Sequence, residues 1–180
     1  MMLKRLRQKF AAKAMESIKK RVESNRERHF TDLTKVQTVL ILQVANGNSL
    51  PADLNHFVSE FERLGATVDV IALSRQKQAP AQLEEQPNIT YVSPADFSWL
   101  KLPKSDKILK LLEKNHDYFI DLTCAESGAA ACIANASMAK FKIGKIQYSG
   151  CPYDFTLAAC NESDLGFFEE QLFLYLKKIS

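Results

Sequence analysis

The sequence has few glycines and prolines, six of each in 180 residues, and it contains no long apolar run. The scarcity of glycine and proline excludes collagen-like and low-complexity chains. An apolar stretch of about 20 residues, as a membrane-spanning helix requires, is absent. Neither GxGxxG nor GxxxxGK[ST] occurs, which removes the two common glycine-rich phosphate loops.

Cysteine is present without a pattern of metal binding or redox chemistry. Cys124, Cys132, Cys151 and Cys160 are spaced 8, 19 and 9 residues apart and form no CxxC pair, so they offer no zinc knuckle. We expect reduced, mostly buried thiols, because an unreactive Cys behaves as a small hydrophobe. No uncharged apolar stretch follows the first basic residues, so no secretory signal is predicted and the expected location is cytoplasmic.

The charge of the chain is unevenly distributed. Residues 1–35 carry +7, whereas the remaining 145 residues carry −4. Residues 2–29 lack Gly and Pro and are rich in good helix formers, which predicts a long helix. We therefore divide the chain into a basic amphipathic helical arm (1–34) and a single α/β domain (35–180). Apolar side chains spaced three or four apart form a thin stripe along the helix, namely Leu3, Leu6, Phe10, Ala14, Ile18 and Val22.

A basic arm on a mildly acidic body indicates a polyanionic partner. Nucleic acid, the ribosome and an anionic membrane surface all fit this pattern, and a protein partner is also open. A solvated helix docked on its own domain is the alternative explanation. The candidate polyanion-binding residues are Lys4, Arg5, Arg7, Lys9, Lys13, Lys19, Lys20 and Arg21.

Strands and helices alternate through the rest of the chain. The predicted strands cover residues 39–42, 68–73, 89–92, 118–122, 141–144 and 153–159. The predicted helices cover residues 54–64, 107–114, 127–138 and 165–179. This alternation predicts a three-layer, mainly parallel, Rossmann-like sheet of about six strands in the order 3-2-1-4-5-6. We expect the apolar loop that contains Phe97 and Trp99 to cover the core.

In such a sheet, ligands bind beyond the carboxyl ends of the strands where the winding reverses, here between strands one and four. Two small polar loops would face this crevice and precede helices whose amides could hold an anion. A nucleotide or a sugar is the ligand class that we consider. The same residues could also be simple turn formers and helix caps. The candidate ligand-binding residues are Asn46, Gly47, Asn48, Thr123, Glu126 and Ser127.

Catalytic and metal-binding patterns do not emerge. Ser127 sits in a sequence that resembles a nucleophile elbow, but a hydrolase would need a histidine after it, and all three histidines come earlier. His56 and His116 show no paired carboxylate at ligand spacing. We therefore name no catalytic residue, no metal and no cofactor, and we read Asp121, at a strand end, as a candidate buried polar anchor.

Three segments resemble a small bacterial family of unknown function, known from anaerobic gut-type species. They are Tyr118–Thr123, Ala139–Gly144 and Tyr153–Phe155. The resemblance covers nearly the whole chain, including the basic helix and the Trp99–Pro103 loop. It implies no activity, because none is established for that family.

More distantly, the body resembles the N-terminal, acceptor-side half of lipopolysaccharide heptosyltransferases. The shared pattern is an apolar first strand that ends in a glycine-containing turn, a later YFIDL strand, an Ala-rich helix and the segment AKFKIG. In that family an acidic base follows the turn glycine, whereas Asn48 follows Gly47 here and cannot accept a proton as a carboxylate does. The donor-sugar domain is also missing. The resemblance therefore implies the fold and argues against the reaction.

These observations favour an uncharacterised, non-catalytic binding or adaptor module with a basic arm. The alternative is a small-ligand binding protein, or a reduced glycosyltransferase-like enzyme, that uses the crevice between strands one and four. Glu126 would then be the carboxylate available for acid–base work.

Overall fold

The computed structural model describes residues 2–45, 49–74, 76, 87–125, 128–157 and 165–179, with side chains from residue 5 onward. The α-helices are α1 (Met2–Asn25), α2 (Asp53–Arg63), α4 (Asp106–Glu113), α5 (Ala129–Ala136) and α6 (Leu165–Ile179). Short 3₁₀ helices are η1 (Leu33–Lys35) and η2 (Pro94–Asp96). The strands are β1 (Thr38–Val44), β2 (Thr67–Leu73), β3 (Ile89–Val92), β4 (Tyr118–Asp121), β5 (Phe141–Gly144) and β6 (Phe155–Thr156).

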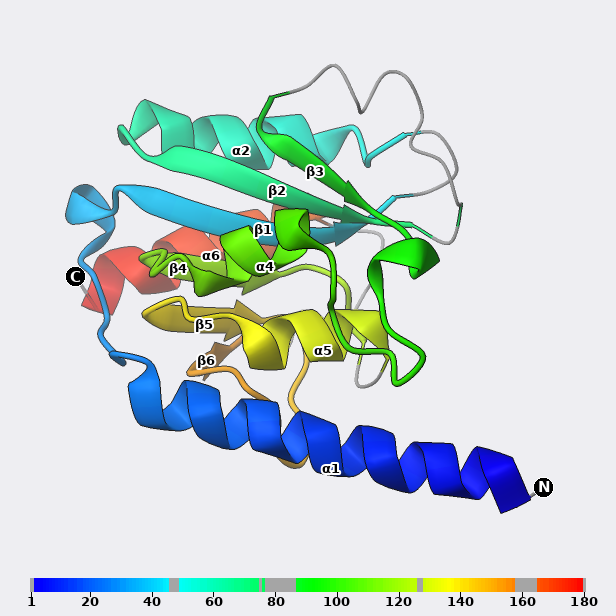
Figure 1. Ribbon diagram of the computed structural model, residues 1–180. Coiled ribbons are helices and arrows are strands. Elements are labelled where there is room, and N and C mark those ends of the chain that lie inside the picture. Colours follow the sequence, from blue (N-terminus) through cyan, green and yellow to red (C-terminus); the bar gives the residue numbers. More distant parts are fainter. Residues whose placement is uncertain are drawn as a thin grey trace.

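The six strands form one sheet in the order β3-β2-β1-β4-β5-β6, and every neighbouring pair is parallel (Figure 1). The predicted Rossmann-like topology is therefore confirmed. The last strand is shorter than the predicted 153–159, of which residues 158 and 159 lie outside the described residues. It begins late because the carboxylate of Asp154 accepts the backbone N–H of Lys142 at 2.8 Å, the group that a strand partner would otherwise bond.

Helices cover both faces of the sheet, as the continuous apolar runs in its strands require. Val39 and Ile41 of β1 point to one face, where they share a core with α2 and α6. Leu40 and Leu42 point to the opposite face and pack with α4 and α5. Successive side chains of a strand alternate between faces, so one strand supplies the centre of both cores and the body has three layers.

Helix α1 lies outside these layers and packs along α5 at the β6 edge of the sheet (Figure 1). Val22 is its buried contact, and the helix ends at Asn25, a turn earlier than predicted. The segment that follows runs into the core, where the ring of Phe30 lies 6.2 Å from that of Tyr118 and 5.2 Å from that of Phe141. The division of the chain at residue 34 stays a prediction.

One buried carboxylate joins the end of α1 to the sheet. Asp154 accepts hydrogen bonds from Arg26, Arg28 and the backbone of Lys142. The Arg26 side chain is 5% exposed and also donates to the carbonyl of Ala139 at 2.6 Å, whereas the Arg28 side chain is 67% exposed. Arg26 and Asp154 therefore form an ion pair that is largely removed from water, whereas Arg28 contacts the same carboxylate from the surface.

We expect the variant Asp154→Asn to lose roughly 3–5 kcal/mol of unfolding free energy, because it leaves the Arg26 charge buried without a counter-charge. Arg28→Gln removes the exposed partner of the same carboxylate and should cost no more than about 1 kcal/mol. Urea unfolding of both variants measures the difference. Equal losses of unfolding free energy in the two variants would show that the buried Arg26–Asp154 pair stabilises the fold no more than the exposed Arg28 contact.

Candidate functional site

The edge of the sheet where β1 and β4 end is the predicted crevice. The two strands are neighbours, so the winding reverses between them as expected. Of the six candidate ligand residues only Thr123 lies within the described residues, and its backbone N–H donates to Asp121 at 2.8 Å. The others, which lie outside the described residues, are Asn46, Gly47, Asn48, Glu126 and Ser127. Their role in ligand binding stays a prediction.

Asp121 is a buried carboxyl group at this point of the sheet. It is the last residue of β4, and the hydroxyl of Tyr153 donates to its Oδ2 at 2.8 Å. Burial raises the pKa of Asp121, although hydrogen bonds from Thr123 and Tyr153 act in the opposite direction. Burial and the nearby Asp121 likewise raise the pKa of Tyr153. A carboxyl group with a raised pKa at a sheet switch point is a candidate proton donor as well as a structural anchor.

The contact between Asp121 and Tyr153 depends on Gly144. In the β4–β5 register, Asp121 is paired with Gly144. A Cβ atom at Gly144 would lie 2.5 Å from Cδ2 of the Tyr153 ring. The absence of a side chain therefore lets the ring lie on the end of β5 and reach the carboxyl group.

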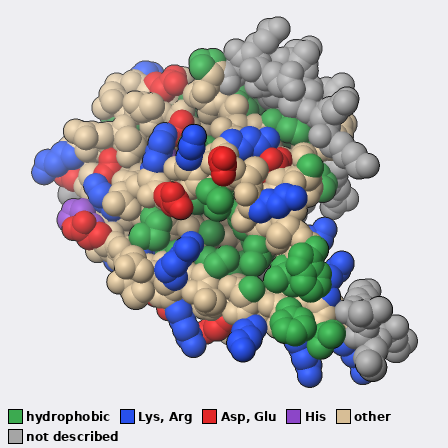
Figure 2. Space-filling model, viewed as in Figure 1, with side chains coloured by type: hydrophobic (Ala, Val, Ile, Leu, Met, Phe, Trp, Pro, Cys, Tyr) green, Lys and Arg blue, Asp and Glu red, His purple; other side chains and the backbone are tan. Residues whose placement is uncertain are grey.

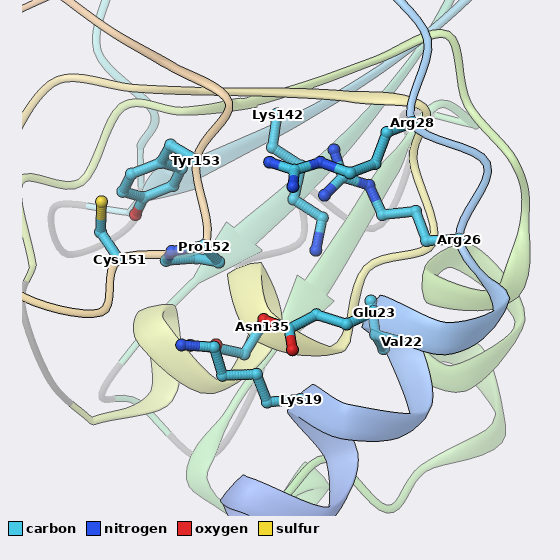
Figure 3. A pocket seen from close by; sticks show the side chains of 10 residues that line it. All are labelled: Lys19, Val22, Glu23, Arg26, Arg28, Asn135, Lys142, Cys151, Pro152 and Tyr153. Carbon is cyan, nitrogen blue, oxygen red and sulfur yellow. The ribbon is translucent and has the colours of Figure 1, made fainter.

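A cationic cleft lies beside this point, between α1 and the body (Figure 3). Its volume is about 290 Å³. It is lined by Lys19, Val22 and Glu23 of α1, Arg26 and Arg28 after it, Asn135 of α5, Lys142 of β5, and Cys151, Pro152 and Tyr153 before β6. Tyr153 thus lines the cleft and also donates a hydrogen bond to the buried Asp121. Burial, with Arg28 nearby, lowers the pKa of Arg26 to about 10, so this group stays cationic at neutral pH.

The predicted polyanion-binding residues separate into two sets. Lys19 is half-buried and turns towards the body, where its Nζ donates to the carbonyl of Gly150 at 3.2 Å. The side chain of Lys4 lies outside the described part of the structure. The exposed members are Arg5, Arg7, Lys9, Lys13, Lys20 and Arg21. Figure 2 shows Lys and Arg side chains along the lower edge of the molecule, where α1 runs.

The apolar stripe of α1 is only partly used for docking. Val22 is buried and Ile18 half-buried, whereas Leu6 and Phe10 are about half exposed. Arg7, Ala11 and Met15 of α1 line a pocket together with residues of α5, so this part of α1 still faces the body. Leu6 and Phe10 are exposed because they lie on a different side of the helix from these residues. Within the described residues, no helix combines the length and the apolar character that crossing a membrane requires.

The loop after β3 only partly follows the expectation that it covers the core. Phe97 is buried, but Trp99 is 66% exposed. The loop closes on itself through a bridge between Phe97 and Pro103, which turns Trp99 outward. Among the described cysteines, Cys132 is buried and its burial raises the thiol pKa to about 11, as expected for an unreactive thiol. Cys124 and Cys151 are only partly buried, so the expectation of mostly buried thiols is met in part.

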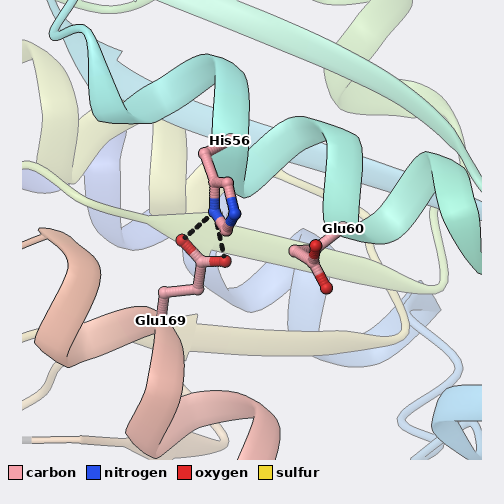
Figure 4. A group of neighbouring side chains, drawn as sticks. All are labelled: His56, Glu60 and Glu169. Carbon is pink, nitrogen blue, oxygen red and sulfur yellow. Dashed lines mark hydrogen bonds and ion pairs between the residues drawn. The ribbon is translucent and has the colours of Figure 1, made fainter.

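The expectation that His56 has no carboxylate at ligand spacing is wrong. Nδ1 of His56 lies 2.9 Å from an oxygen of Glu169 on α6, and Glu60 lies on α2 one turn after His56 (Figure 4). Their potential ligand atoms all fall within 4.8 Å of one another. The His56–Glu60 spacing of four was visible in the sequence, but Glu169 is brought in only by the fold. This set could hold a divalent cation with water completing the coordination, and it also ties α2 to α6.

We expect Gly144→Ala to destabilise the fold by about 1–3 kcal/mol, because the added methyl group displaces the Tyr153 ring from a packed position. Gly166→Ala, in the exposed first turn of α6, is the control and should be neutral or stabilising by up to about 1 kcal/mol. Thermal unfolding compares the two. A Gly144→Ala protein as stable as wild type would mean that the ring has another place to lie.

The variant Asp121→Asn tests the raised pKa of the buried carboxyl group. A carboxyl group with a higher pKa in the folded than in the unfolded chain contributes stability at low pH, and this is lost as the pH rises through the folded value. Asparagine does not ionise, so the unfolding temperature of the variant relative to wild type should rise between about pH 4 and about pH 8. If the unfolding temperature of the variant relative to wild type stays constant or falls as the pH rises, the pKa of Asp121 is not raised.

A model of the family DUF6913, described as a family of unknown function, matches residues 7–179. No curated protein and no solved structure matches the chain. The family match includes all but the first residues of α1 and the whole of the sheet. The chain belongs to the DUF6913 family of unknown function.

Proposed function

We propose that the protein is a non-catalytic cytoplasmic binding or adaptor module that holds a polyanionic partner on the outer face of α1. The observation that carries the proposal is the orientation of the helix. Its inner face is fixed to the body by Val22 and by the segment through Arg26, while most of its basic side chains face solvent.

Lys9, Lys13 and Lys20 make up this outer basic face. Residues separated by four, seven or eleven positions lie on one side of a helix, so the three lysines form a row. Lys20 has an exposed partner in Glu16 at 3.7 Å, and exposed pairs of this kind are weak. Among the described residues, Lys9 and Lys13 have no ion-pair partner. A row of lysines with weak internal pairing is suited to phosphate groups.

The exposed side chains of Leu6 and Phe10 help to distinguish between the possible classes of polyanionic partner. Phe10 lies one turn and Leu6 two turns before Lys13 on the same side of the helix, so apolar and basic groups are neighbours there. A nucleic acid or the ribosome would use the lysines alone, whereas an anionic membrane surface would also bury the apolar pair. Dependence on Phe10 therefore distinguishes a membrane surface from the other two partner classes.

The alternative proposal is a small-ligand site, or a reduced glycosyltransferase-like enzyme, at the crevice between β1 and β4. It is supported by the buried Asp121 and Tyr153 at the switch point of the sheet. A thermal-shift response to nucleotides or nucleotide-sugars that disappears in Glu126→Ala would favour it over the arm.

The experiment compares two triple variants of the full chain. Lys9→Gln, Lys13→Gln and Lys20→Gln remove the outer row, and Lys101→Gln, Lys104→Gln and Lys110→Gln remove three exposed lysines elsewhere. Binding to an RNA oligonucleotide and to phosphatidylglycerol vesicles is measured over a salt series. We expect the outer-row variant to bind at least about tenfold more weakly, with a salt slope reduced by about 3, while the control keeps its affinity.

Substitution is preferable to removal of residues 1–30, because that deletion also removes the contacts of Val22, Arg26 and Phe30. Adding Phe10→Ser should reduce vesicle binding and leave RNA binding unchanged if the partner is a membrane surface. Salt-insensitive binding, or equal binding by both triple variants, would show that the basic helix α1 does not bind the polyanion.

A further inference from the structure

The cationic cleft is lined in part by a lysine that is almost fully buried and has few partners. Lys142 is 1% exposed, and its Nζ donates to the carbonyl of Ala134 at 2.8 Å. This carbonyl belongs to the last turn of α5, so the amine caps that helix. A neutral amine has two N–H donors and an ammonium group has three, and no second hydrogen bond from this Nζ occurs among the described residues. Buried polar groups usually have their donors satisfied, so the amine is short of acceptors in either protonation state.

Positive groups surround this amine (Figure 3). Lys19, Arg26 and Arg28 line the cleft, and Glu23 is the one carboxylate among its lining residues. Asp154 neutralises part of the charge from behind the arginines, and both of its oxygens are already engaged. The cleft therefore keeps an excess of positive charge and of hydrogen-bond donors.

We propose that the cleft binds the phosphoryl group of a small phosphate monoester, held by Lys142 from the body and Arg28 from the segment after α1. Arg28 has donors to spare, because its Nε and Nη2 contact Asp154 and its Nη1 is left for a ligand. Arginine and lysine together match a dianion with three acceptor oxygens, since charge-assisted hydrogen bonds are the strong ones.

The size of the cleft sets the scale of the ligand. A volume of about 290 Å³ lies at the lower end of small-molecule sites. One compact molecule fits, and a polymer does not. A sugar phosphate and a nucleoside monophosphate share the phosphoryl chemistry, and they differ in the group that the rest of the cleft must accept.

Protonation of the buried amine accompanies binding. Burial lowers the pKa of Lys142 well below its ordinary value, Arg26 and Arg28 lower it further, and Glu23 opposes them. The other titratable side chains that line the cleft are Lys19, Cys151 and Tyr153, with Asp154 behind the arginines. A dianion beside the amine raises its pKa, so the complex takes up a proton and binding weakens as the pH rises.

This site is separate from the outer row of α1. Lys9, Lys13 and Lys20 face solvent, whereas the cleft lies on the side of α1 that faces the body. The inference therefore goes beyond the proposed polyanion binding, and either one can fail while the other holds.

The test is calorimetric titration of the full chain at constant ionic strength with inorganic phosphate, glycerol phosphate, ribose phosphate and adenosine monophosphate. Lys142→Met and Arg28→Gln are the site variants. Met matches the length of the lysine stem, and Arg28 is largely exposed, so both should fold; thermal unfolding checks this. The triple variant of the outer row is the matched control.

We expect saturable phosphate binding by wild type and by the control, and a dissociation constant at least about tenfold higher in each site variant. Glycerol phosphate titrated at about pH 8 in buffers of different ionisation enthalpy should reveal proton uptake that is lost in Lys142→Met. Tighter binding of ribose phosphate or of adenosine monophosphate identifies the source of the phosphoryl group. Absence of saturable binding, or equal affinities in folded site variants and control, would overturn the proposal.

Discussion

The ion pair between Arg26 and Asp154 is the contact on which the arrangement of α1 depends. It joins residues 128 positions apart in the sequence and is largely removed from water. Arg26 also bonds the carbonyls of Ala139 and Lys140, so a single guanidinium group holds the end of the helix to the start of β5. The cleft exists because this contact sets the distance between α1 and the body. Desolvation makes such a pair costly to break.

Most of the fold follows from local patterns in the sequence. The apolar run Val39–Leu42 predicted a strand buried on both faces, and the alternation of strands with helices predicted the α/β class. The strand order was predicted from the common doubly wound arrangement. These features are predictable because periodicity and turn residues act over a few positions. The short β6 was not, since it depends on a side chain of Asp154 that replaces a backbone partner of Lys142.

The sites were less predictable because they are made of residues distant in sequence. Lys142 reads as one polar residue in a short strand, and only the packing of α1 and α5 over it creates a cleft. Glu169 joins His56 only because α6 lies beside α2. The sequence placed the winding reversal between β1 and β4 correctly, whereas the crevice itself stays a prediction, because most of the residues that would line it lie outside the described residues. Phe10 shows the limit of periodicity, which finds an apolar stripe on a helix but not which side of that helix the body covers.

The sequence separation between Arg26 and Asp154 also has a consequence for folding. Helix α1 is synthesised before the sheet, and the Arg26–Asp154 pair can form only after five of the six strands have been made. Closing so long a loop comes late in folding, after the local elements have formed. For most of its synthesis the chain therefore carries its most basic segment without the buried ion pair that fixes the end of α1 in the complete fold.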